Sequence, residues 1–204
     1  MNARRFRLAV PGVDLREIGV HAEFREEPWV DERAEAAAAG DSEAFEELFN
    51  AFLPAVYRYV AVQVPTREDA EDACQLIFER LIVTMPTYRR GATPFATQVF
   101  RLARAVVLDQ ERRRRRAAAL EQREADLPPL PEELVIAGVE RQEVAAAFAQ
   151  LTPDQRHALA LRYGAGMSAE EAARVMGRQA GTIRGLTFRA LSAIRRHIRT
   201  RQDR

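Results

Sequence analysis

The feature that most limits the possible folds is a break in an otherwise helical pattern of apolar residues. Between Ala117 and Glu133 that pattern disappears, and three prolines, Pro128, Pro129 and Pro131, stand among acidic residues. Proline fixes its own backbone and lacks an amide hydrogen, so this stretch indicates a linker rather than a helix. On both sides of it, apolar residues recur every three to four positions, as they do in amphipathic helices. The sequence therefore predicts an all-α fold of two small helical domains joined by an acidic, proline-containing linker.

The boundaries of these parts follow from the same pattern. We predict an N-terminal extension of unknown role (1–30), a first domain (31–116), the linker (117–134) and a second domain (135–204). A chain of 204 residues and 23.0 kDa can bury a modest core in each domain.

Composition limits the classes of function. With 47% hydrophobic and 30% charged residues, the chain is typical of a globular protein, and no membrane span or signal peptide is expected. Its one cysteine, Cys74, excludes an internal disulfide and a thiolate zinc cluster. From the expected lack of a span and of a signal peptide we expect a cytoplasmic protein. Because the three histidines are scattered along the chain, we expect no cofactor, no metal and no catalytic site.

The helix expected from Pro65 to about Met85 separates its acidic residues from its apolar ones. Thr66 can cap its first turn, where acidic side chains complement the helix dipole. Its apolar face consists of Ala70, Cys74, Ile77 and Leu81. Its opposite face consists of Asp69, Asp72, Leu76 and Glu79. Solvation alone can explain the carboxylates, but a leucine among them suggests a surface for a protein partner.

Arginines gather in the loop after this helix and in the next helix. The loop runs from Pro86 to Pro94 and contains Tyr88 beside two arginines. An aromatic ring beside arginines can stack on an unpaired base and hold it. A loop that is merely polar is the alternative. The arginines of the loop and of the helix that follows are Arg89, Arg90, Arg101, Arg104 and Arg112 to Arg116.

The strongest local pattern in the second domain is that of a helix-turn-helix. Ser168 and Glu171 form a capping box at the start of a short helix, and Gly177 ends that helix. A longer helix follows, whose exposed start carries Thr182 and Arg184. This order presents the second helix to the major groove of DNA. An ordinary helical hairpin with a basic, solvated face is the alternative.

Taken in order, these features resemble the extracytoplasmic-function sigma factors over roughly residues 34–198. The matching strings are Ala38-Ala39-Gly40-Asp41, Asp69-Ala70-Glu71-Asp72, Arg101-Leu102-Ala103-Arg104, Leu151-Thr152-Pro153 and the helix-turn-helix. The resemblance implies a sigma-2 domain that docks on polymerase and opens the promoter, and a sigma-4 domain that reads the minus-35 element. It implies as partners the beta and beta-prime subunits of core RNA polymerase, promoter DNA and an anti-sigma factor.

The resemblance also implies three sets of site residues. The clamp-binding set is Asp69, Asp72, Gln75, Leu76 and Glu79. The minus-10 set is Tyr88, Arg89, Arg90, Phe95, Arg101, Arg104 and Arg112. The minus-35 set is Arg178, Gln179, Thr182, Arg184, Gly185 and Arg189.

The chain departs from the family pattern at Gln98, where Trp is usual, and at Ala105, where Asn is common. Both positions bear on readout of the minus-10 element. Two other functions remain open at this stage. A stand-alone helix-turn-helix regulator would bind DNA without polymerase, which leaves the acidic face unexplained. A sigma-like decoy would bind an anti-sigma factor without opening a promoter.

Overall fold

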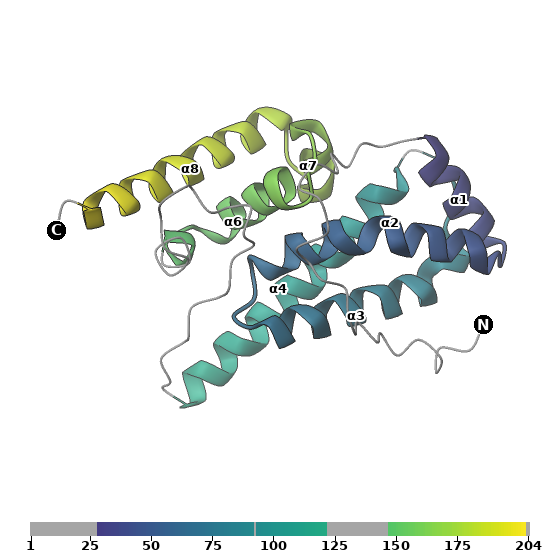
Figure 1. The fold of residues 1–204 in the computed structure, drawn as a ribbon, viewed down its shortest axis with the longest axis horizontal. Helices are drawn as coiled ribbons and strands as arrows, with labels where there is room; N and C mark the ends of the chain where they lie inside the picture. Colours follow the sequence, from purple (N-terminus) through teal and green to yellow (C-terminus); the bar gives the residue numbers. More distant parts are fainter. Residues whose placement is uncertain (1–27, 92, 122–146, 203–204) are drawn as a thin grey trace.

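The computed structural model describes residues 28–91, 93–121 and 147–202, and within these ranges every regular element is helical (Figure 1). The N-terminal domain contains α1 (Pro28–Ala38), α2 (Ser42–Ala61), α3 (Arg67–Thr84), the 3-10 helix η2 (Met85–Thr87) and α4 (Phe95–Glu121). The C-terminal domain contains the helical residues 147–149, α6 (Pro153–Leu159), the π-helical turn η4 (Ala160–Gly164), α7 (Ala169–Met176) and α8 (Ala180–Gln202). The predicted all-α class is confirmed. None of the described helices is long and apolar enough to cross a membrane.

Aromatic rings fill the centre of the N-terminal domain. Phe52 of α2 meets Phe95 of α4 edge to face, with ring centroids 5.5 Å apart. Tyr59 meets Phe100 in the same way at 5.8 Å. Such pairs contribute about 0.5 to 1.5 kcal/mol each beyond the burial of their surface. Helix α2 therefore forms the centre of this domain, with α1, α3 and α4 packed around it (Figure 1).

Helix α3 follows the pattern predicted from the sequence. Thr66 is its N-cap, and the Thr66 hydroxyl accepts a hydrogen bond from the amide of Asp69 at 3.0 Å. The four residues of the predicted apolar face, Ala70, Cys74, Ile77 and Leu81, are all buried. The apolar face of α3 is thus confirmed, whereas on the opposite face Asp72 and Glu79 are exposed and Leu76 is half-buried against the core.

Two helices extend across the predicted boundaries. Helix α1 begins at Pro28, within the predicted extension, and Val30 is buried in the core. Helix α4 continues to Glu121, five residues into the predicted linker, because its alanines and leucine favour a helix. The predictions for residues 1–27 and for the rest of the linker lie outside the described residues.

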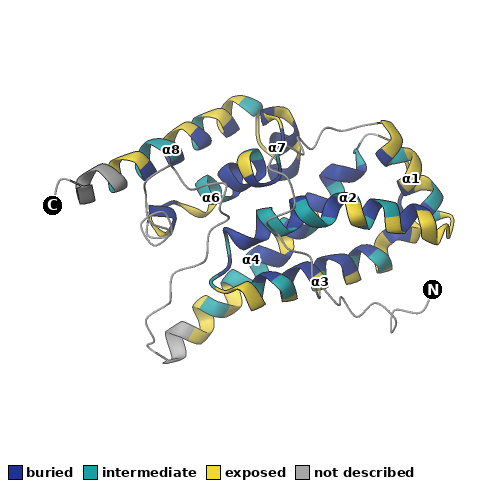
Figure 2. Ribbon diagram, in the orientation of Figure 1, coloured by how far each residue is buried: buried dark blue, intermediate teal, exposed yellow. Residues whose placement is uncertain are grey.

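The two domains pack against each other, which the sequence did not predict. Helices α6 and α7 and the turn η4 lie beside α2 and α4, and the main contacts join α4 to α7 and α2 to η4 (Figure 1). The buried apolar residues of both domains form one continuous cluster. Figure 2 shows buried residues on α2, α4, α6 and α7. The contact is therefore an internal interface with its own core.

Candidate polymerase and nucleic-acid interfaces

The helix-turn-helix has the geometry that its sequence indicated. The Ser168 hydroxyl accepts from the amide of Glu171 at 3.1 Å, and the Glu171 carboxylate accepts from the amide of Ser168 at 2.6 Å. Gly177 ends α7 in the left-handed conformation, with φ of 63°. That conformation suits glycine because it has no Cβ. The cap and the turn together fix the direction in which α8 leaves α7.

The turn before α8 and the first half of α8 present most of the minus-35 set to solvent. Ile183, Ala190 and Ile194 face the core and are buried. The exposed members of the set are Arg178, Gln179, Thr182, Arg184 and Arg189, and Gly185 is half-buried. Arg184 donates to the Glu170 carboxylate at 2.9 Å, but both side chains are more than half exposed, at 63% and 59%. Water screens such a pair, so the Arg184 guanidinium remains available to another anion.

Sequence reasoning missed one residue of this surface. Phe188 is 70% exposed although it is a large apolar side chain. It lies four residues after Arg184, so the two side chains share one helix face. In the sequence, the four-residue spacing between Arg184 and Phe188 indicates that Phe188 lies on the same helix face as Arg184.

The clamp-binding set divides into exposed and half-buried members. Asp72, Gln75 and Glu79 are exposed, while Asp69 and Leu76 are half-buried. The Gln75 amide donates to the Glu79 carboxylate at 2.9 Å, which keeps the two side chains side by side on the surface. The Asp69 carboxylate instead accepts from the Thr66 hydroxyl at 3.0 Å. Asp69 therefore also belongs to the N-cap of α3.

Two members of the minus-10 set do not lie on an exposed loop as expected. Tyr88 and Phe95 are both buried, and their rings meet edge to face at 5.3 Å. The carboxylate of Asp31 in α1 accepts from the Tyr88 hydroxyl at 3.0 Å and from the Phe95 amide at 2.8 Å. Burial, together with the hydrogen bond to Asp31, raises the pKa of Tyr88. In this conformation these rings belong to the core and are not free to stack on a base.

The exposed residues of this region are its arginines. Arg89, Arg90 and Arg112 are exposed. Arg89 donates to the carbonyls of Pro86 and Tyr88 at 3.0 and 2.6 Å, which ties its guanidinium to the loop itself. At Gln98, where the family usually has Trp, the side chain donates to the carbonyl of Thr93 at 3.1 Å. Ala105 is exposed on α4.

Two other arginines of the minus-10 set contact the C-terminal domain. Arg101 donates through Nε and Nη2 to the carbonyl of Arg174, at 3.2 and 2.9 Å. Arg104 lies 3.6 Å from one carboxylate oxygen of Asp154, and Arg178 of the minus-35 set lies 3.0 Å from the other. Residues predicted for two different DNA elements thus meet at one place.

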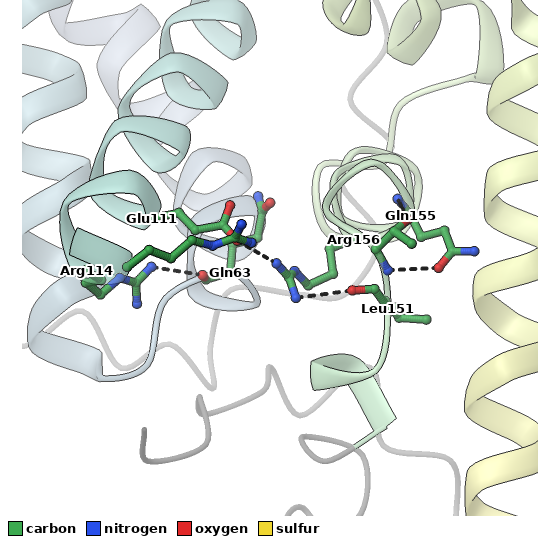
Figure 3. Close-up of polar contacts among 8 residues, drawn as sticks. Gln63, Glu111, Arg114, Leu151, Gln155 and Arg156 are labelled. Atoms are coloured by element: carbon green, nitrogen blue, oxygen red, sulfur yellow. Dashed lines mark hydrogen bonds and ion pairs between the residues drawn. The ribbon is translucent and has the colours of Figure 1, made fainter. Parts of the chain in front are cut away.

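The polar edge of the interface is formed by Glu111 and Arg156 (Figure 3). The Arg156 guanidinium lies 2.9 Å from the Glu111 carboxylate of α4 and also donates to the carbonyl of Leu151 at 3.3 Å. Both side chains of the pair are mostly buried, at 21% and 19% exposure. The same view shows Arg114 donating to the carbonyl of Gln63 at 3.4 Å within the N-terminal domain.

A buried tyrosine and a buried histidine meet at the centre of the interface. Tyr59 Oη lies 2.8 Å from Nδ1 of His157, and both side chains are almost completely buried. Burial raises the pKa of Tyr59, so its phenol stays protonated. Burial, with the positive charges of Arg104 and Arg156, lowers the pKa of His157 to about 3. His157 is therefore neutral at physiological pH, and its Nδ1 accepts a hydrogen bond from the Tyr59 hydroxyl.

Comparison with known proteins identifies both domains. Residues 48–117 match the family described as Sigma-70 region 2, and residues 141–194 match Sigma-70, region 4. The ECF RNA polymerase sigma factor SigD of Mycobacterium tuberculosis H37Rv is 31% identical over 172 residues, which cover 79% of this chain and 80% of SigD. The chain belongs to the ECF sigma factors. This sigma factor is a protein of transcription initiation, as the order of its sequence features predicted.

A second relative agrees with this assignment, and two solved structures share the fold. BldN, an ECF RNA polymerase sigma factor of Streptomyces coelicolor, is 30% identical over 169 residues, which cover 81% of this chain but only 64% of BldN. The fold resembles that of RpoE of Bartonella quintana in complex with the anti-sigma factor NepR, with a TM-score of 0.64, 22% identity and coverage of 76% and 96% of the two chains. It also resembles CnrH in complex with the cytosolic domain of CnrY, with a TM-score of 0.62, 24% identity and coverage of 80% and 93%. A stand-alone helix-turn-helix regulator does not require a Sigma-70 region 2 domain, and residues 48–117 match that family. The match therefore argues against the stand-alone regulator.

Proposed function

We propose that this sigma factor binds the beta and beta-prime subunits of core RNA polymerase through the acidic face of α3, and that α8 then directs the complex to its promoters. The observation that carries the proposal is the separation of two exposed surfaces of opposite charge. The α3 surface offers Asp72 and Glu79, and the α8 surface offers Arg184 and Arg189. One suits a basic protein surface and the other suits DNA.

In this proposal the start of α8 enters the major groove at the minus-35 element. Arg184 can donate two hydrogen bonds to the edge of a guanine, while Thr182 contacts a base or a phosphate. Phe188 supplies an apolar contact to a thymine methyl group. The exposed arginines Arg89, Arg90 and Arg112 contact promoter DNA near the minus-10 element.

The proposed function also concerns partners and location. The protein acts by binding rather than by catalysis, and it works in the cytoplasm, where polymerase and promoters are. An anti-sigma factor is a further proposed partner. Of the solved structures with this fold, RpoE is in complex with the anti-sigma factor NepR, and CnrH is in complex with the cytosolic domain of CnrY.

Charge reversal on α3 tests the contact with polymerase. The best pair is Asp72→Arg with Glu79→Arg, because both residues are exposed and Asp69 would also disturb the N-cap. We expect the double variant to lose co-purification with core polymerase and promoter-dependent transcription. The matched control is Glu35→Arg with Glu46→Arg, which makes the same charge change on exposed positions of α1 and α2 and should retain binding. Equal polymerase affinity of both double variants would refute the proposal.

A further inference from the structure

We propose that Asp31 is a positioning residue for the contact with minus-10 DNA, because its carboxylate fixes the segment that carries Arg89 and Arg90. The inference rests on the proposed function, in which these two arginines contact promoter DNA near the minus-10 element. Asp31 lies in α1, outside the residues 48–117 that match Sigma-70 region 2. The family match therefore does not assign a role to Asp31.

Both hydrogen bonds at Asp31 end on the same oxygen atom. Asp31 Oδ1 accepts from the Tyr88 hydroxyl at 3.0 Å and from the Phe95 amide at 2.8 Å. Tyr88 and Phe95 are both buried, so water does not readily replace Asp31 as the acceptor. A buried donor without an acceptor is costly, and a charged acceptor makes the stronger bond. Asp31 thus fixes the chain on both sides of the two arginines.

The two arginines depend on this anchor to different degrees. The Arg89 guanidinium donates to the carbonyl of Tyr88 at 2.6 Å, so its position follows that of the anchored Tyr88. Arg90 is joined to α1 by an ion pair with Glu32 at 3.7 Å, but these two side chains are 47% and 62% exposed. Water screens such a pair. The buried hydrogen bonds are therefore the stronger polar link between α1 and the arginine segment.

Loss of Asp31 has two opposing effects on DNA affinity. Long side chains that are ordered before binding lose less entropy when they bind, so loss of the anchor weakens the affinity. Removal of an acidic residue close to arginines leaves the region more positive, which strengthens its attraction to phosphate. The sign of the change in affinity therefore decides whether Asp31 acts through its hydrogen bonds or through its charge.

Three variants separate the hydrogen bonds from the charge. Asp31→Ala removes both. Asp31→Asn removes the charge but keeps an Oδ1 that can accept both bonds. Glu32→Ala removes the same charge from the next, exposed residue of α1 and leaves Asp31 in place. We expect Asp31→Ala to bind DNA about tenfold more weakly than the native chain, and the other two variants to bind it at least as tightly.

Limited digestion of the full chain with trypsin tests the anchor without DNA or polymerase. Trypsin cuts after arginine, and it cuts a segment slowly when the surrounding structure holds that segment in place. Mass spectrometry measures the rate of cleavage after Arg89 and Arg90. We expect that rate to rise several-fold in Asp31→Ala and to stay near the native value in Asp31→Asn and Glu32→Ala. A native rate in Asp31→Ala would show that the anchor does not hold the segment.

Polymerase reconstituted with each variant tests the consequence for DNA. The probe is a promoter duplex that the native complex protects, with its minus-10 element unpaired by mismatches, and affinity is measured over a range of salt. Asp31→Ala should lower the affinity without changing the slope of log K against log salt, because both arginines are still present. Arg90→Ala, which removes one phosphate contact, should instead reduce the magnitude of that slope by about 0.7.

Two results would overturn the positioning role. One is an affinity of Asp31→Ala equal to or above the native value, and the other is an equal loss of affinity in Asp31→Asn. Co-purification with core polymerase should be the same for the native chain and for all of these variants. The trypsin assay uses no polymerase, so it decides the anchoring even if the α3 contact is refuted, and the two proposals can fail independently.

Discussion

Two glycines of the helix-turn-helix should respond in opposite directions to the same substitution. Gly177 has φ of 63°, and a Cβ there would meet nothing within 4 Å. The cost of Gly177→Ala is therefore conformational, about 1 to 2 kcal/mol for an L-residue in the left-handed region. Gly185 lies inside α8, where a Cβ would make only an ordinary contact at 3.9 Å with Arg189. Gly185→Ala should stabilise the helix by about 0.8 to 1 kcal/mol.

Thermal unfolding of the full chain followed by circular dichroism measures this contrast. For a chain of this size, 1 kcal/mol corresponds to about 2 to 4 °C in the unfolding midpoint. Gly177→Ala should therefore lower the midpoint by a few degrees, and Gly185→Ala should raise it. Each variant is the other's control, since the chemical change is identical. Midpoints that shift in the same direction would show that the turn after α7 does not have the conformation described.

Two further predictions concern single side chains. Burial raises the pKa of the Cys74 thiol to about 12, so the native protein should resist iodoacetamide at pH 8 and react once it is denatured; labelling of the native chain within minutes would contradict the packing of α3. Arg184→Ala should weaken binding to a matched minus-35 duplex by about 1 to 3 kcal/mol, measured by anisotropy, and should weaken binding much less when the contacted base pair is changed. In Glu170→Ala, which removes the carboxylate that Arg184 contacts at 2.9 Å, binding should be retained; an equal loss in both variants would remove Arg184 as a base contact.

The elements predicted well from the sequence are those with local signals. Thr66 and Ser168 mark helix starts through bonds to residues three positions away, and Gly177 marks a helix end by its own conformation. Such features are visible within a few residues of sequence. The separation of acidic and apolar faces on α3 has the same local origin, because it depends only on helical spacing.

The features that were missed depend on residues far apart in the chain. Tyr88 looked like an exposed loop residue because its partner Asp31 lies 57 positions earlier. The domain interface depends on Tyr59 and His157, which are 98 positions apart. No spacing rule connects such residues, and an aromatic ring or a histidine alone does not indicate what will cover it. The end of α4 was missed for another reason, because the alanines after Arg116 favour a helix but lie where the amphipathic pattern stops.

The double hydrogen bond at Asp31 has a mechanical consequence. One carboxylate of α1 accepts hydrogen bonds from the hydroxyl of Tyr88 and the amide of Phe95, which flank the segment that contains Arg89 and Arg90. Each of these two residues can move outward only if its own hydrogen bond to Asp31 breaks or α1 shifts with it. A displacement of α1 that keeps both hydrogen bonds would therefore also displace the loop that carries Arg89 and Arg90.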